Sequence, residues 1–249
     1  MSTRPATDPR VADLVRGGRL RVGLGPVALH WAIKDAQTGE LRGVAVDLAR
    51  ALAEHIGVAF EPVTYPSPPN VLDGLATKAW DIAFLGMDPA RAAAVDYAPP
   101  HIRIEATFVV PAGSAVRSIA DADRPGVRIA VARGSVEETV LRHRLKHAEV
   151  LGTATGSAGF ESLRNGAVEV LAAPTPAAIG FAARLPGSRM LEGSFHTTYG
   201  AIAVAKGEMG WLGYVAAFIE QAKASGLVQH AIDRAGVRGV AVAPPGYPS

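Results

Sequence analysis

The sequence contains no cysteine among its 249 residues. This absence excludes a disulfide-stabilised scaffold, a thiolate zinc site, an iron–sulfur cluster and a cysteine nucleophile. It leaves the redox compartment undetermined, because a chain without thiols is compatible with either environment. Evidence about function must come from other residues.

The chain also lacks a long apolar run and an excess of charge. Its longest uncharged stretch, residues 170–183, is interrupted by Pro174 and Pro176 and is shorter than the roughly 18 residues of a membrane span. We therefore expect a soluble protein. The 25 Lys and Arg nearly balance the 23 Asp and Glu, so the charge gives no reason to expect a nucleic-acid partner.

A secretory signal is not evident at the start of the sequence. Residues 1–10 read MSTRPATDPR, whereas a signal needs a basic start followed by an apolar stretch of about 7 to 15 residues. For the sequence as given, the expected location is cytoplasmic. It is periplasmic if a signal was removed from the natural form.

Alternating strand and helix patterns indicate an α/β fold. Strands are predicted at residues 20–24, 58–65 and 81–85, with helices at 43–56 and 70–79, the second opened by Asn70 as its cap. This βαβαβ order predicts a parallel sheet.

The pattern then restarts as a second α/β unit. After a strand at 107–111, strands are predicted at 127–131 and 168–172 and helices at 135–147 and 159–165. The chain returns through a strand at 197–204 to a helix at 209–224. Residues 236–249 are rich in Pro and Gly, which predicts an irregular tail.

Several segments, in their order along the chain, resemble the family 3 extracellular solute-binding proteins, the amino-acid-binding components of ABC importers. The resemblance covers about residues 14–235. It is carried by LRVGL (20–24), GELRGVAVDLARALAEHIG (39–57), KAWDIAFLGMDPARAAAVDYAPPHI (78–102), VRIAVARGSVEETVLRHRL (127–145), VEVLAAPTPAA (168–178) and YGAIAVAKG (199–207).

This resemblance implies a type II periplasmic-binding fold. Two Rossmann-like α/β lobes would be joined by a two-strand hinge, with a ligand in the cleft between them. Lobe 1 would comprise residues 1–108 and 202–249, and lobe 2 residues 109–201. The implied protein is a monomeric binding protein without catalytic residues, metal or cofactor. Its implied partners are a small carboxylate-bearing solute and the membrane subunit of an ABC importer.

The resemblance places the ligand carboxylate at Arg91, in an Asp88-x-x-Arg91 segment where the family has Thr-x-x-Arg. Gly86 and Asp88 would flank it. Arginine suits this role because its planar guanidinium can pair with both oxygens of a carboxylate. The plainer interpretation is a helix start, capped by Asp88 and followed by Pro89, that leaves Arg91 in solvent.

Gly134 and Ser135 are the predicted contribution of the second lobe. Backbone N–H groups at a helix start can bind an anion, and the family has Gly-Thr at this place. The alternative is an ordinary serine cap, which Glu138 three residues later favours. Trp31 stands where the family has an aromatic wall, and its alternative is core packing.

Pro174 replaces the aspartate with which family members bind an α-ammonium group. An ammonium without a carboxylate partner is costly to bury, so we expect ordinary α-amino acids to bind poorly unless Thr175, Asp88 or Glu192 takes this role. Thr175 is therefore included in the predicted site. Two alternative functions remain: an enzyme on the same fold, similar to the cyclohexadienyl dehydratases, with Asp88, Glu105 or His101 as acid or base, and a cytoplasmic solute sensor.

Overall fold

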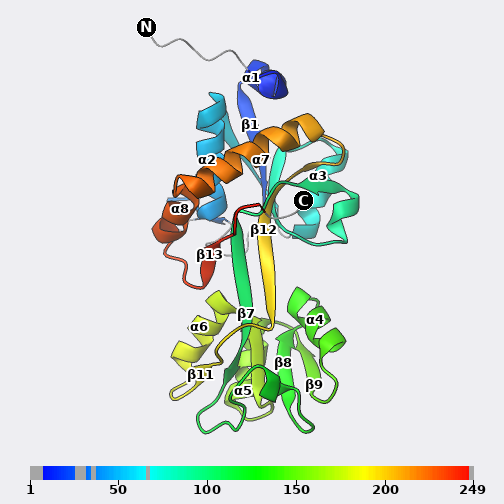
Figure 1. Cartoon of the computed structure of the whole chain (residues 1–249), viewed down its shortest axis with the longest axis vertical. Helices are drawn as coiled ribbons and strands as arrows, with labels where there is room; N and C mark the ends of the chain where they lie inside the picture. Colours follow the sequence, from blue (N-terminus) through cyan, green and yellow to red (C-terminus); the bar gives the residue numbers. More distant parts are fainter. Residues whose placement is uncertain (1–7, 26–31, 35–37, 66–67, 247–249) are drawn as a thin grey trace. The chain divides into compact units, whose positions relative to one another are not determined.

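A computed structural model describes residues 8–25, 32–34, 38–65 and 68–246 (Figure 1). Contacts within the chain divide it into two compact units. Unit 1 comprises Met1–Arg103, Tyr199–Val237 and Ala241–Ser249, and unit 2 comprises Ile104–Thr198 and Arg238–Val240. Two strands, β7 (Ile102–Val110) and β12 (His196–Ala205), continue from one unit into the other.

Unit 1 is built on three parallel strands. Strand β1 (Arg19–Leu24) lies between β4 (Ala59–Thr64) and β5 (Ile82–Gly86), and β12 pairs with β5 in the antiparallel direction. Its other elements are η1 (Pro9–Val11), α1 (Ala12–Gly17), β2 (Ile33–Lys34), β3 (Leu41–Arg42), α2 (Val44–Ile56), α3 (Pro68–Ala76), η2 (Arg91–Ala93), β6 (Val95–Tyr97), α7 (Met209–Ala224) and α8 (Leu227–Ala235).

Unit 2 repeats this arrangement. Strand β8 (Arg128–Ala132) lies between β9 (Glu149–Thr153) and β10 (Val170–Pro174), all parallel, and β7 pairs with β10 in the antiparallel direction. The remaining elements are η3 (Ala120–Ala122), α4 (Val136–Arg144), α5 (Gly156–Arg164), α6 (Thr175–Arg184), β11 (Arg189–Met190), which pairs with β7, and β13 (Val240–Val242), whose first residue belongs to this unit.

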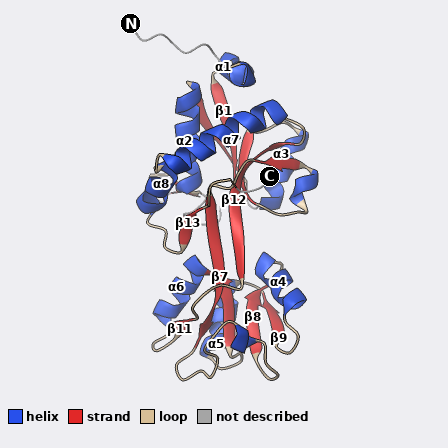
Figure 2. Ribbon diagram, in the orientation of Figure 1, coloured by secondary structure: helices blue, strands red, loops and turns tan. Residues whose placement is uncertain are grey.

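Helices cover both faces of the sheet in unit 2, as Figure 2 shows by its colours. Successive residues of β10 therefore enter different cores. Val170 and Ala172 belong to one hydrophobic cluster, whereas Leu171 and Ala173 belong to the other. This division follows from the period of two along a strand, and it explains why the segment is continuously apolar.

The strand order determines where each unit can bind a ligand. Across the sheet of each unit, the parallel strand that comes first along the chain lies between the second and the third. The strand order therefore reverses at the first strand. Ligands of open α/β sheets bind at the carboxyl ends of the strands where the order reverses. These positions are the ends of β1 and β5 in unit 1 and of β8 and β10 in unit 2.

The predicted α/β class and parallel pairing are confirmed, and the bounds predicted for α7 agree with the structure. The lobe boundaries predicted at 108/109 and 201/202 lie a few residues beyond those of the units. Several elements had no sequence prediction, among them β9, α6 and α8. No helix in the described ranges is long and apolar enough to cross a bilayer.

Two local predictions are wrong. Helix α3 begins at Pro68 rather than after an Asn70 cap, because proline fits the first helical turn, where its missing N–H is not needed. The segment predicted as an irregular tail contains β13. The amide of Ala243 just beyond it donates to the carbonyl of His101 (3.1 Å), so backbone pairing orders a segment that its Pro and Gly content marked as loop.

Gly74 in α3 provides a test of this packing. An added Cβ would contact the Tyr65 hydroxyl and would lie 2.7 Å from Nε1 of Trp80, which donates to the carbonyl of Val71 (2.8 Å). Overpacking costs about 1–3 kcal/mol, so we expect Gly74→Ala to lower the free energy of unfolding in urea despite the helix preference of alanine.

The matched control is Gly180→Ala in α6, where an added Cβ has nothing within 4 Å. There alanine should raise the free energy of unfolding by about 0.5–1 kcal/mol. If both variants are stabilised to the same extent, the tight contact described for Gly74 is wrong.

Candidate functional site

Arg91 lies at the carboxyl end of β5 in unit 1, at the first residue of η2. Its Nη1 donates to the carbonyl of Gly86 (2.8 Å), and its Nη2 lies 3.9 Å from Oδ2 of Asp88. The Arg91 side chain is 22 % exposed. A guanidinium carries five N–H donors, so these contacts leave some of them for an anion that reaches this edge of the sheet.

Asp88 forms a tight turn that sets the position of Arg91. Its Oδ1 accepts from the amide of Ala90 (2.9 Å), and its carbonyl accepts from the amide of Arg91 (3.0 Å). This Asx turn leads only into the short 3₁₀ helix η2, so the helix predicted to begin here is a single turn. The hydroxyl of Tyr97 also donates to Gly86 (3.3 Å), and burial raises the pKa of Tyr97, which keeps the phenol neutral.

Unit 2 has a pocket of about 200 Å³ at the corresponding place, where β8 and β10 end and α4, α5 and α6 begin. The labels of β8, α4, α5 and α6 in Figure 1 locate four of these elements. The pocket is lined by Val131, Ala132, Ser135, Glu137, Thr155, Gly156, Ser157, Ala172, Ala173, Pro174, Ala177 and Phe181. It therefore occupies the position at which the strand order predicts ligand binding.

Two hydroxyls of this pocket cap its helices. The Oγ of Ser135 accepts from the amide of Glu138 (3.1 Å), and Oγ1 of Thr155 accepts from the amide of Ala158 (3.1 Å). The serine cap, which was the alternative interpretation of Ser135, is therefore present. Each cap satisfies one backbone donor of a first helical turn.

The backbone donor of Gly134 is bound by a carboxylate of the chain itself. Its amide donates to Oε2 of Glu138 (2.7 Å), whose Oε1 accepts from Nη2 of Arg142 (2.8 Å). These contacts, the Gly134 hydrogen bond first, lower the pKa of Glu138. The predicted anion site at Gly134 therefore holds an internal anion in this structure, and a ligand that used this amide would have to displace it.

Glu137 is the group that sequence reasoning missed. It is 9 % exposed and, among the residues that the structure describes, is the only ionisable one that lines the pocket. In the described part of the chain, its carboxylate makes no ion pair or hydrogen bond. Burial lowers the pKa of neighbouring His196 and outweighs the charge of Glu137, which raises it. The imidazole is therefore neutral at pH 7 and supplies no balancing charge.

The remaining predicted residues contribute differently. Thr175 is not part of the pocket lining, since its hydroxyl donates to the carbonyl of Glu105 (2.8 Å) and so ties α6 to β7. Pro174 lines the pocket and, like Pro176 in the first turn of α6, has no N–H to offer a ligand. Trp31 lies outside the described residues.

Comparison with known proteins gives one family. The sequence model of the bacterial extracellular solute-binding proteins, family 3, matches residues 20–236. Among curated proteins, none matches the chain.

Solved structures share the fold. A putative binding component of an ABC transporter from Wolinella succinogenes, complexed with lysine, is 26% identical, with a TM-score of 0.72 over 87% of this chain and 95% of that one. An amino acid ABC transporter substrate-binding protein from Streptococcus pneumoniae, bound to L-arginine, is 22% identical, with a TM-score of 0.68 over 90% and 96%. An ancestral cyclohexadienyl dehydratase is 26% identical, with a TM-score of 0.59 over 93% and 97%. The type II periplasmic-binding fold expected from the resemblance is thereby confirmed.

The contact between Glu138 and Gly134 predicts a pH-dependent stability. Because folding lowers the pKa of Glu138 from its ordinary value of 4.5, the carboxylate stabilises the folded chain above that pH. This contribution is lost as the pH falls through the folded-state pKa. We expect Glu138→Gln to lower the melting temperature at pH 7, and the difference from the parent chain to shrink in acid.

Glu149→Gln is the control, since Glu149 is exposed on β9 of the same unit. It should change the melting temperature little at any pH. A deficit of Glu138→Gln that stays constant from neutral to strongly acidic pH would contradict the proposed charge effect.

Proposed function

Because the chain belongs to the bacterial extracellular solute-binding proteins of family 3, we propose that it captures a small carboxylate-bearing solute, an amino acid or a related organic acid, for an ABC importer. The role needs only reversible binding. A solute would be held by polar groups at the carboxyl ends of the parallel strands, and the membrane subunits would receive it from the loaded protein.

Arg91 supports the acidic part of this proposal. It has unused N–H donors, and Gly86 and Asp88 hold it at the end of β5. A carboxylate can accept two parallel, charge-assisted hydrogen bonds from such a group. Arg91 therefore is the proposed anchor of the ligand carboxylate.

The single observation that carries the proposal furthest is Glu137. The residue is 9 % exposed, its carboxylate is unpaired within the described residues, and a cation would balance its charge. A ligand ammonium group would supply that cation beside Pro174, which lines the same pocket. The prediction from Pro174 that α-amino acids bind poorly remains untested, and Glu137 supports the opposite outcome.

An enzymatic function is the second candidate. The structural similarity to an ancestral cyclohexadienyl dehydratase and a buried carboxyl group in the pocket support it, since such chemistry needs an acid that can protonate a leaving group. Incubation with a cyclohexadienyl carboxylic acid would produce aromatic absorbance if the chain catalyses this reaction. A binding protein would leave the spectrum unchanged.

Calorimetric titration tests the proposed function. The panel pairs common α-amino acids with carboxylic acids of the same side chain that lack the ammonium group. We expect at least one amino acid to bind, and Glu137→Gln to weaken its binding by about tenfold or more, because a charged hydrogen bond is lost. Glu149→Gln should bind as the parent chain does.

The outcomes separate the two parts of the proposal. If only the acids without an ammonium group bind, the role given to Glu137 is wrong and the prediction from Pro174 is correct. If no member of either class binds, the proposed substrate class is contradicted.

A further inference from the structure

A second pocket lies at the opposite edge of the unit 1 sheet. It has a volume of about 390 Å³ and is formed where β1 and β5 begin, beside α1, the end of α3 and the start of α7. Since β5 separates it from Arg91, the two places are roughly 16 Å apart or more. It is lined by Arg10, Asp13, Leu14, Arg21, Leu75, Lys78, Trp80, Asp81, Ala205, Glu208 and Trp211.

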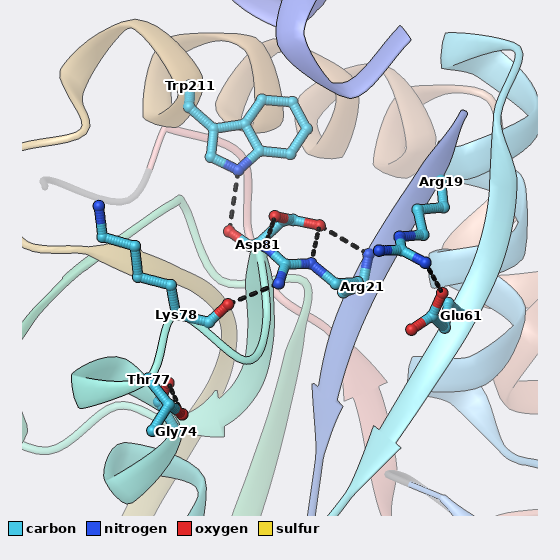
Figure 3. A network of polar contacts seen from close by, with 8 residues as sticks. All are labelled: Arg19, Arg21, Glu61, Gly74, Thr77, Lys78, Asp81 and Trp211. Carbon is cyan, nitrogen blue, oxygen red and sulfur yellow. Dashed lines mark hydrogen bonds and ion pairs between the residues drawn. The ribbon is translucent and has the colours of Figure 1, made fainter. Parts of the chain in front are cut away.

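Most charges in this pocket are already balanced. Arg21 pairs with Asp81 through two side-chain hydrogen bonds, and its Nη1 donates to the carbonyl of Lys78 (2.6 Å) (Figure 3). Arg10 pairs with Asp8, and Asp13 pairs with Arg16. These ion pairs build the wall of the pocket and leave their members little charge to offer a ligand.

Lys78 and Glu208 differ from these residues. Over the described ranges, neither side chain makes a hydrogen bond or an ion pair, with each other or with any other group. Figure 3 shows the Lys78 ammonium at the free end of its side chain, away from the dashed contacts of the network. The pocket thus presents one unpaired positive and one unpaired negative group.

The backbone of Lys78 adopts the left-handed conformation. With φ of 50°, it is the only non-glycine residue of the described chain in the left-handed region, whereas fifteen glycines occupy positive φ. This conformation ends helix α3: the amide of Lys78 donates to the carbonyl of Leu75 (3.1 Å), and the amide of Ala79 donates to the carbonyl of Gly74 (2.9 Å). Glycine is the residue most often found at such a helix end. The hydrogen bond from Arg21 to the Lys78 carbonyl adds a further contact at this helix end.

An aromatic surface completes the pocket. The Nε1 of Trp211 donates to the carbonyl of Asp81 (3.0 Å), and its ring stacks on Tyr214 at 5.7 Å between centroids. The indole is therefore fixed in orientation. With Leu75 and Leu14 in the lining, it offers an apolar surface to a ligand side chain.

We propose that this pocket is a second binding site, for a small zwitterion with an apolar or aromatic side chain. Its carboxylate pairs with Lys78, its ammonium pairs with Glu208, and its side chain lies against Trp211. The site is independent of the proposed solute site, because none of its residues is shared with the surroundings of Arg91 or Glu137.

The test uses L-phenylalanine as the probe and the indole N–H signal of Trp211 in NMR as the readout, assigned with Trp211→Phe. It is made in the Arg91→Ala chain, so that binding at the proposed solute site is removed. We expect a saturable shift of this signal. Phenylpropionate and phenethylamine, which each lack one charge, should bind about tenfold more weakly or worse.

Three variants test the residues. Lys78→Gly removes the ammonium, and glycine favours the left-handed backbone at this helix end, so the variant should fold at least as well and bind the probe about tenfold more weakly. Glu208→Gln should do the same, whereas Lys146→Ala on the surface of unit 2 should change nothing. The proposal is overturned if L-phenylalanine gives no saturable shift, if Lys78→Gly binds it as the parent does, or if phenylpropionate binds as tightly.

Discussion

Parallel pairing of three strands, with the first strand in the middle, is the constraint on which the rest of the structure depends. It sends the connections of each sheet in opposite directions and brings the ends of two strands together with the starts of their helices. Backbone donors and capping hydroxyls gather at that edge because the helices begin there. Arg91 in unit 1 and Glu137 in unit 2 both lie at such an edge, although nothing in their local sequence relates them.

Charged side chains that already have a partner within the chain stabilise the fold, whereas those without a partner are available to bind a ligand. Glu138 is held by Gly134 and Arg142 and serves the start of α4. Its neighbour Glu137 points into the pocket without a partner in the described chain. Two adjacent carboxylates on one helix thus have different roles, one in folding and one in the proposed binding of a cation. The same distinction marks Lys78 and Glu208 among the paired charges at the other edge of unit 1.

Much of this fold can be predicted from the sequence, because apolar periodicity reports directly on burial. The continuous apolar run of β10 and the amphipathic pattern of α2 both led to correct elements. The serine cap at Ser135 is equally local. Predictions failed where contacts between residues distant in the sequence determine the local structure. Strand β13 is ordered by pairing with β7, and no pattern within residues 236–249 indicates this partner.

Glu137 was missed for a related reason. Hydropathy would place Val136 inside and Glu137 outside, whereas Val136 is 40 % exposed and Glu137 is buried. The orientation follows from where α4 begins above β8, which a linear sequence does not give. The binding of Gly134 by Glu138 likewise depends on the left-handed backbone of Gly134, which turns its amide toward that carboxylate.

The central claim is that the chain captures one small acid through Arg91. Native mass spectrometry of protein purified without dialysis tests it most directly, since a retained solute adds its own mass to the chain. The account predicts one additional small mass on the parent protein, absent from Arg91→Ala of the same stability. The same added mass on both proteins, or none on the parent even after addition of the acids and amino acids of the panel, would contradict it.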